Sequence, residues 1–252
     1  MNNYNTEQFE SDLKHFNICL SRKQMEQFLT YYEMLAEWNQ KMNLTAITEF
    51  EDVMKKHFVD SLSLAKVYGA AESSQLEPVL MTSPMSVIDV GTGAGFPGLA
   101  LKIAFPDLKM TLLDSLNKRI LFLDAVIEKL SLSGVNTVHG RAVDFAKPGQ
   151  LRESFDLCVS RAVANLSVLS EYCLPFVKQG GTFVSYKSEK ISEEIGAAGK
   201  AISILGGKLE KQIEFMLPDS DIYRNLVVIK KLKATPKKYP RKAGLPTKEP
   251  LL

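Results

Sequence analysis

The sequence predicts an α/β fold in which a mainly parallel sheet follows an N-terminal helical segment. Short apolar runs alternate with longer stretches of helical composition from residue 86 to about residue 205. The first run leads directly into a glycine-rich turn, an arrangement typical of parallel sheets that bind nucleotides. The last two runs are separated only by Pro218–Arg224. Because this connection is too short for a helical crossover, these two strands should pair antiparallel.

The first third of the chain is predicted to be helical. In Ser21–Asn39 the apolar residues recur at the spacing of one helix face, and Phe50–Ala65 carries a similar stripe. We expect a shorter helix at Phe9–Phe16 and a loop at Trp38–Ile47. The stretch Gly69–Pro84 is rich in Ala, Ser and Pro, and it is the best candidate for a domain boundary.

The part of the chain after this stretch supplies the sheet. The predicted strands are Val87–Val90, Met110–Leu113, Thr137–His139, Leu157–Ser160, Thr182–Tyr186, Gln212–Leu217 and Asn225–Leu232. The predicted helices are Pro97–Phe105, Lys118–Leu132, Leu166–Val177 and Ser192–Leu205. Such alternation favours a parallel sheet covered by helices on both faces. We therefore divide the chain into a helical cap (residues 1–80), a sheet domain (81–233) and a basic tail (234–252).

The composition predicts a globular cytoplasmic protein. Of the 252 residues, 45% are hydrophobic and 24% are charged, and no apolar run is long enough for a membrane helix. The first residues are polar and contain no signal-peptide core. The cysteines and histidines lack the spacing of a metal site, so we expect reduced thiols and no bound metal. These residues are Cys19, Cys158, Cys173, His15, His57 and His139.

Charge is distributed unevenly along the chain. Residues 230–252 contain eight basic side chains and one acidic one, so this end is +7 although the whole chain is only +2. Lysines release counterions from nucleic-acid phosphates, which makes an RNA or DNA partner plausible. A solvated tail that keeps the protein soluble explains the same charge, and composition alone does not separate the two interpretations.

The glycine-rich turn, Gly91-Thr-Gly-Ala-Gly-Phe-Pro-Gly98, predicts a cofactor site. It contains the G-x-G-x-x-G pattern of dinucleotide enzymes, but three features favour S-adenosylmethionine. Asp89 precedes the glycines inside the strand, as in class I methyltransferases. Pro97 has no N–H to offer a pyrophosphate. The sheet also leaves no chain for the separate substrate domain of a dehydrogenase. We therefore expect Asp89, Gly91, Gly93 and Gly95 to form the cofactor loop.

Two further carboxylates follow predicted strands. Asp114 ends the second strand, where a carboxylate can accept both ribose hydroxyls; its alternative role is to cap the next helix. We favour the ribose role. Asp144 follows the third strand, at the place where this fold usually contacts adenine. It either accepts from the adenine amino group or caps a turn, and the sequence supports both equally.

Four segments carry a resemblance to one family. They are Asp89-Val-Gly-Thr-Gly-Ala-Gly-Phe-Pro-Gly-Leu99, Leu112-Leu-Asp-Ser-Leu-Asn-Lys-Arg119, Ser160-Arg-Ala-Val-Ala164 and Tyr239-Pro-Arg-Lys-Ala-Gly-Leu-Pro246. Together they resemble the bacterial ribosomal small subunit methyltransferase G family, also called glucose-inhibited division protein B. The resemblance implies a class I S-adenosylmethionine-dependent methyltransferase fold, Rossmann-like, with a seven-stranded sheet. It also implies methylation of N7 of one guanine in 16S ribosomal RNA.

The family resemblance also assigns residues to the cofactor. It implies that Gly91, Phe96, Ala142, Val143 and Arg161 contact S-adenosylmethionine. Val143 departs from the family pattern, in which Glu is usual at this position. Either Asp144 or backbone atoms would then make the adenine contact.

Methylation of N7 explains why no catalytic base is evident in the sequence. Guanine N7 has an in-plane lone pair and no proton to lose, so alignment is sufficient. Because the product is cationic, we assign Arg141 and Arg161 to RNA phosphate or to the cofactor carboxylate. The alternative for either arginine is a salt bridge to a neighbouring acid such as Asp144 or Asp156. We expect His57 to be a core residue paired with Asp60.

The RNA contacts are expected at the rim of the site and in the tail. Lys187 ends the fifth strand, and Arg241 and Lys242 lie in the tail. Tyr239 would stack a base there, although the tail alternatively folds back on the sheet. We expect a monomer that acts on 16S ribosomal RNA or the small ribosomal subunit. The competing hypotheses are an RNA-binding assembly factor without activity and an NAD(P)-dependent oxidoreductase.

Overall fold

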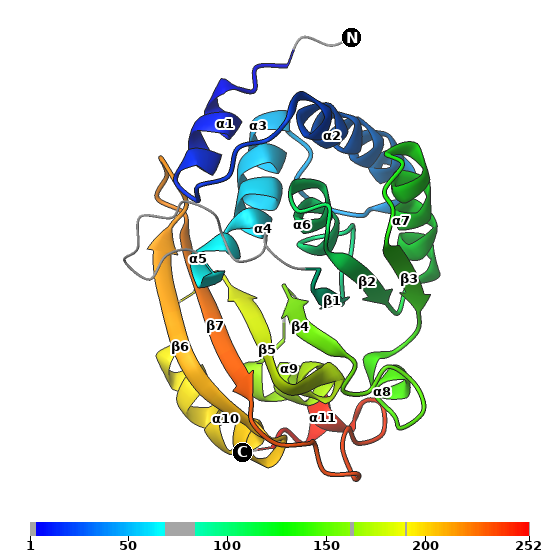
Figure 1. Ribbon diagram of the computed structural model, residues 1–252, viewed down its shortest axis with the longest axis vertical. Helices are drawn as coiled ribbons and strands as arrows, with labels where there is room; N and C mark the ends of the chain where they lie inside the picture. The colour runs from blue at the N-terminus through cyan, green and yellow to red at the C-terminus, as the bar shows by residue number, and fades with distance from the viewer. Residues whose placement is uncertain (1–3, 69–83, 162–163, 190, 252) are drawn as a thin grey trace.

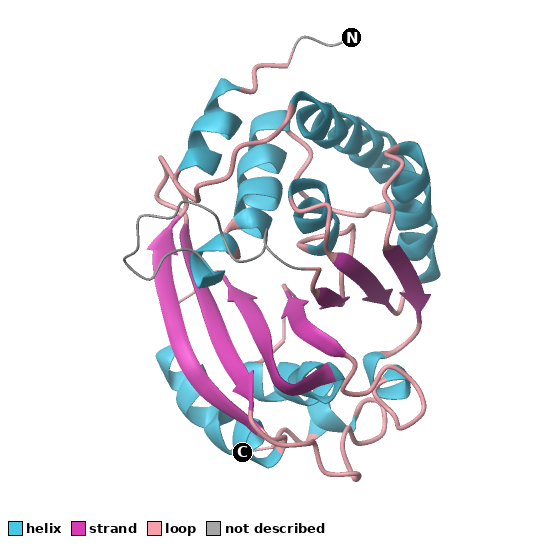
Figure 2. Cartoon of the chain, viewed as in Figure 1, coloured by secondary structure: helices cyan, strands magenta, loops and turns pink. Residues whose placement is uncertain are grey.

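The computed structural model describes residues 4–68, 84–161, 164–189 and 191–251. Its centre is a seven-stranded sheet with the order β3-β2-β1-β4-β5-β7-β6 (Figure 2). The five strands from β1 to β5 are parallel, and β7 pairs antiparallel with both β5 and β6. The strands are β1 Ser86–Val90, β2 Lys109–Asp114, β3 Val135–His139, β4 Phe155–Ser160, β5 Val177–Lys187, β6 Gly207–Met216 and β7 Tyr223–Lys231. The predicted class I methyltransferase sheet with its terminal hairpin is confirmed.

Helices cover both faces of this sheet (Figure 1). One layer combines the N-terminal helices with two crossover helices, and the other contains the remaining crossovers and the tail. The first layer comprises α1 Glu7–Lys14, α2 Arg22–Met42, α3 Phe50–Val53, the π-helix η1 Met54–Val59, α4 Asp60–Leu62, α6 Gly98–Ala104 and α7 Asn117–Lys129. The second layer comprises α8 Ala142–Phe145, α9 Leu166–Cys173, the 3-10 turn η3 Leu174–Phe176, α10 Ser192–Ile204 and α11 Leu245–Lys248. The short helix α5 Ala65–Tyr68 lies near β6 and β7.

The N-terminal helices share one apolar core with the cofactor-loop side of the sheet. Phe28 and Phe58 are fully buried and their rings lie 4.9 Å apart. Phe96, in the glycine-rich turn, lies 5.8 Å from Phe58. The helical segment is therefore built into the layer that supports the turn. The boundary predicted at residue 80 lies outside the described residues.

Several predicted boundaries differ from the structure for local reasons. Helix α2 begins after Ser21, whose side chain forms a capping box with Gln24, but continues to Met42, three residues beyond the predicted helix end at Asn39. The helix predicted as Leu166–Val177 is α-helical only to Cys173 and continues as the 3-10 turn Leu174–Phe176, because Pro175 has no N–H to donate to the Glu171 carbonyl. The predicted helix Phe50–Ala65 contains a π-helical stretch. The edge strand β6 starts at Gly207 and is mostly exposed, so no apolar run marked its beginning.

Within the described part of the chain, no helix combines the length and the apolar character needed to cross a bilayer.

Candidate functional site

The glycine-rich turn leaves β1 at its carboxyl end and wraps back toward β2. Gly91, Gly93 and Gly95 have φ values of 75°, 64° and 98°, a region that glycine occupies without strain. A Cβ added to Gly93 would meet no atom within 4 Å, whereas one at Gly95 would collide with the Tyr31 hydroxyl. Gly93 therefore faces open space, and Gly95 allows close packing of the turn against α2.

Asp89 supports the turn from behind. Its side chain is fully buried, and its Oδ2 accepts the Gly98 N–H at 2.9 Å. Burial raises the pKa of Asp89 to about 6, although the Gly98 hydrogen bond opposes this shift. Asp89 and Gly95 do not line the cavity described below, so they shape the cofactor loop from outside it.

Asp114 ties the ends of two strands together. Its Oδ2 accepts the Gly93 N–H and its Oδ1 accepts the Leu116 N–H, both at 2.9 Å. Arg119 Nη1 donates to Oδ2 at 3.1 Å and, at a longer 3.4 Å, to Oδ1. A carboxylate has about four lone-pair sites, so these contacts occupy all of them. A ligand hydroxyl would therefore bind Asp114 by replacing an Arg119 contact.

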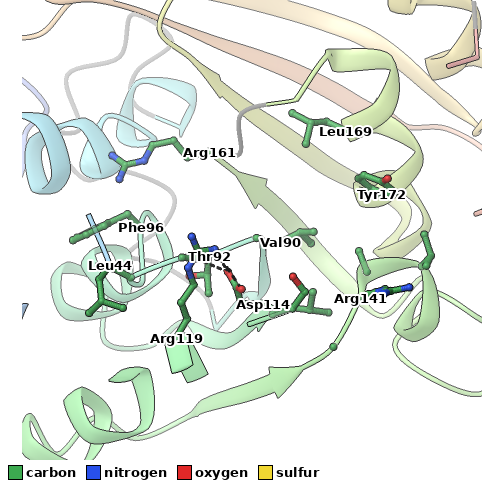
Figure 3. Close-up of a pocket in the computed structure, with 18 of the residues that line it drawn as sticks. Leu44, Val90, Thr92, Phe96, Asp114, Arg119, Arg141, Arg161, Leu169 and Tyr172 are labelled. Atoms are coloured by element: carbon green, nitrogen blue, oxygen red, sulfur yellow. Dashed lines mark hydrogen bonds and ion pairs between the residues drawn. The ribbon is translucent and has the colours of Figure 1, made fainter. Parts of the chain in front are cut away.

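The turn and Asp114 border a cavity of about 830 Å³ at the carboxyl ends of the parallel strands (Figure 3). In open α/β sheets this edge is where ligands bind. The loop after β3 contributes Gly140–Val143, and α9 contributes Leu169 and Tyr172. Phe96 and Arg161 lie at one end of the cavity, while Tyr172 and Arg141 lie at the other (Figure 3).

Arg161, just after β4, is held by the N-terminal helices. Its Nη1 donates to Asp60 Oδ2 at 2.9 Å and to the Lys56 carbonyl at 3.1 Å. Its guanidinium lies 5.2 Å from the centre of the Phe96 ring. Asp60 is 3% exposed and also accepts from Arg224 Nε at 2.8 Å. A buried carboxylate with two arginine partners fixes the position of each guanidinium.

His57, on η1, completes this end of the cavity. Its ring stacks on Phe96 with centroids 4.4 Å apart, and its Nδ1 lies 3.2 Å from Arg161 Nη2. Because arginine only donates, Nδ1 must accept; the ring proton is then on Nε2, which donates to Thr45 Oγ1 at 2.9 Å. Burial, together with the Arg161 charge, lowers the pKa of His57 to about 3. His57 is therefore a neutral side chain with both nitrogens in use.

A second cavity of about 630 Å³ adjoins the first. His57 and Arg161 line both cavities and form the wall between them. Lys187 lies in the second cavity, where its Nζ contacts Glu194 Oε1 at 2.6 Å and the Ala164 carbonyl at 2.7 Å. The two cavities thus meet at one fixed arginine.

Known proteins resemble this chain over nearly its whole length. The family described as "GidB: rRNA small subunit methyltransferase G" matches residues 24–223. A Ribosomal RNA small subunit methyltransferase G of Lachnoclostridium phytofermentans is 51% identical over 97% of this chain and 96% of its own length. One from Limosilactobacillus reuteri is 50% identical over 98% and 99%, respectively. This chain belongs to the rRNA small subunit methyltransferase G family.

A solved structure supports the fold independently of this sequence similarity. A chain in the complex of the Haloferax volcanii Trm112 methyltransferase activator and its methyltransferase partner aligns with a TM-score of 0.54 at 14% identity. The match covers 79% of this chain and 98% of that one.

S-adenosylmethionine, the cofactor of this methyltransferase family, fits the larger cavity. A Cβ at Gly93 would project into unfilled space, and the Asp114 carboxylate lines the cavity, where a ribose hydroxyl would replace an Arg119 contact. Pro97 removes an N–H from the turn, as suits a cofactor without phosphate. The donor set and shape therefore suit a nucleoside with a sulfonium tail.

Of the other predicted site residues, some are exposed, some form ion pairs and some line the cavity. Arg141 and Lys242 are exposed, whereas Arg241 is tied to the buried Glu171 by an ion pair at 2.6 Å. Val143 lines the cavity, while Asp144 faces away and pairs with Lys147 at 2.8 Å. Within the described ranges, no group of three His, Cys, Asp or Glu side chains is placed to hold a metal.

Two expectations are wrong. His57 contacts Thr45 and Arg161 instead of Asp60. Tyr239 is buried, so it is not available to stack a base; the tail folds back, as the alternative proposed. The alternative for Arg161, a salt bridge to a neighbouring acid, is present in the structure, and the acid is Asp60.

Sequence reasoning missed several cavity residues. The contact of Arg119 with Asp114 could have been predicted from the sequence. Arg119 lies five residues after Asp114, in the first turn of α7, so its side chain can reach the end of β2. Thr45, Tyr172 and Ala243 are brought to the cavity only by the tertiary fold.

Proposed function

We infer that this protein transfers a methyl group from S-adenosylmethionine to N7 of a guanine in 16S ribosomal RNA. The observation that carries this inference is the pair of cavities that meet at Arg161 and His57. The larger cavity suits the cofactor, and the second opens beside it at the ends of β4 and β5. In a chain of this family, such a pair supports direct methyl transfer at the place where the two cavities meet.

Different residues of the larger cavity would contact different parts of the cofactor. We propose that Gly91 and Gly93 provide backbone contacts, and that Asp114 holds the ribose. Ala142 and Val143 flank the adenine through backbone and apolar contacts, since Asp144 points away. Phe96 and Arg161 border the sulfonium end, where the Phe96 ring packs against the His57 ring and the Arg161 guanidinium.

The chemistry requires no proton transfer from the protein. The cofactor supplies an electrophilic methyl on sulfur, and guanine N7 attacks it with a lone pair. His57 has no free nitrogen for a base: Nδ1 accepts from Arg161, and Nε2 donates to Thr45. Asp60 is occupied by two arginines. The protein therefore contributes orientation, which supplies roughly 7–11 kcal/mol in favourable cases.

Charge balance near the acceptor suits the cationic product. A lone arginine would repel N7-methylguanine, but the Asp60 carboxylate, which is 2.9 Å from Arg161 and also pairs with Arg224, offsets part of this charge. The target base would enter through the second cavity, past Lys187 and Arg224 on its rim. The exposed Arg141 and Lys242 would contact backbone phosphates farther out.

We further propose a monomer that works in the cytoplasm on 16S ribosomal RNA, free or within the small subunit. The test is transfer of labelled methyl to deproteinised RNA, partly assembled particles and whole subunits, with N7-methylguanosine identified in the digested product. We expect Arg161→Ala to lower transfer at least a hundredfold without unfolding the protein. Arg22→Ala, at an ion pair exposed to solvent, is the control.

Other outcomes distinguish the alternatives. S-adenosylmethionine binding without transfer to any substrate would favour an assembly factor that has lost activity. Val143→Glu, which restores the usual family residue, would then be the first substitution to test for recovery of transfer. Calorimetric binding of NADH but not S-adenosylmethionine would favour an oxidoreductase.

A further inference from the structure

The basic C-terminal tail is a folded part of the protein. Arg152 Nη1 donates to the Tyr239 carbonyl at 2.8 Å, and its Nη2 donates to the Thr235 carbonyl at 2.5 Å. Tyr239 is buried in the apolar core beneath the sheet. The tail then turns so that Ala243 and Gly244 line the larger cavity. This tail lies beyond residue 223, where the family match ends.

An ion pair fixes the tail to α9 immediately before this lining segment. Arg241 donates from Nε to Glu171 Oε1 at 2.9 Å and from Nη2 to Oε2 at 2.6 Å, and its backbone N–H also donates to Oε1. Glu171 is only 1% exposed. The same guanidinium donates to the Glu249 carbonyl at 2.8 Å. Arg241 thus joins α9 to the chain on both sides of Ala243 and Gly244.

The lining segment belongs to one particular end of the cavity. Glu171 is adjacent in sequence to Tyr172, whose hydroxyl lies 3.2 Å from Thr247 Oγ1 in the tail. In Figure 3, Tyr172 lies near Arg141 and away from Phe96 and Arg161. The Arg161 end adjoins the second cavity, so the methyl-bearing sulfur of the cofactor would lie there. The adenine would then lie at the Tyr172 end.

We propose that Ala243 and Gly244 form the outer wall of the adenine site, and that Arg241 is the positioning residue that holds this wall through Glu171. This proposal rests on the proposed function of the larger cavity as the S-adenosylmethionine site. The small side chains of Ala243 and Gly244 let the backbone approach a flat base closely. Arg241 therefore serves the cofactor, and the exposed cations beside it remain for RNA.

Calorimetry of S-adenosylmethionine binding to the full-length protein tests the proposal. Arg241→Gln should weaken binding about tenfold, because the wall loses its attachment. Lys248→Gln, an exposed cation in the same tail, is the control and should stay within about twofold of the wild type. Ala243→Trp leaves the ion pair intact but fills the adenine end, and it too should weaken binding about tenfold or more.

Three further measurements separate a local role from a structural one. The thermal midpoint of Ala243→Trp should match that of the wild type, so its result stands even if Arg241→Gln fails to fold. The variants should lose affinity for 5′-methylthioadenosine by the same factor, because this ligand keeps the adenine and lacks the amino-acid end. Bound cofactor should also slow tryptic cleavage after Lys242 several-fold.

Unchanged affinity in a folded Ala243→Trp protein would overturn the proposal. So would a loss confined to S-adenosylmethionine that spares 5′-methylthioadenosine, since the wall would then lie at the wrong end. Failure of the wild type to bind S-adenosylmethionine at all would instead refute the proposed function.

Discussion

His57 should make the folded protein sensitive to mild acid. Its pKa is lowered from 6.5 to about 3 by burial and by the Arg161 charge. Below pH 6.5 the unfolded chain binds a proton at this residue, and the folded chain does not. Stability from neutral His57 is therefore fully present above pH 6.5 and is lost as the pH falls toward 3.

The size of this effect follows from the two pKa values. Each pKa unit corresponds to about 1.36 kcal/mol. Between pH 7 and pH 5 the free energy of unfolding should decrease by about 2 kcal/mol through His57 alone. Glutamine at this position keeps one acceptor and one donor but does not titrate, so His57→Gln should lack this decrease.

Urea unfolding at pH 7 and pH 5 measures the difference. Every other titrating group, including Asp89 with its opposite shift, contributes equally to both proteins and cancels. His15→Gln, at an exposed histidine after α1, should behave like the wild type. If His57→Gln loses as much stability between pH 7 and pH 5 as the wild type, His57 is protonated in the fold, and the hydrogen bonds derived above are wrong.

Two other substitutions test the supports of the site. Gly98→Ala would place a methyl group 2.9 Å from the Asp89 carboxylate and should lower the free energy of unfolding by about 1–3 kcal/mol in urea titrations. Gly199→Ala, whose added methyl meets nothing within α10, should be neutral or stabilising. Asp60→Asn should lower kcat at least about tenfold with a smaller change in KM, because misplaced groups cost rate. The control Asp52→Asn, at a half-exposed ion pair, should leave kcat unchanged. If kcat is the same in both variants, Asp60 does not position Arg161.

The sheet was predictable because its strands carry local signals. The buried run at Val87–Val90 can only be a central strand of a parallel sheet, and the short Pro218–Arg224 connection forces an antiparallel end. The strand β6 was recognised only in its second half because an edge strand alternates weakly. The glycine turn was equally predictable, since its positive φ values are strained for residues other than glycine.

The partners of the site residues were not predictable, because they are distant in sequence. Arg161 meets Asp60 across about a hundred residues, and Arg241 meets Glu171 across 70. His57 and Asp60 would share one face of an ideal α-helix. The π-helical turn Met54–Val59 changes that spacing, so His57 and Asp60 reach Arg161 separately. A single sequence carries no signal for such contacts.

These distant pairs explain how the site tolerates so many cations near a reaction that creates another. Arg119 pairs with Asp114, Arg241 with Glu171, and Arg161 with Asp60, which Arg224 shares; all three carboxylates are at least 95% buried. Removing one buried partner leaves an uncompensated charge at a typical cost of about 3–5 kcal/mol. These pairs therefore offset part of the positive charge beside the cavity and hold its walls in place. The same contacts that reduce the charge also fix the groups that orient the cofactor.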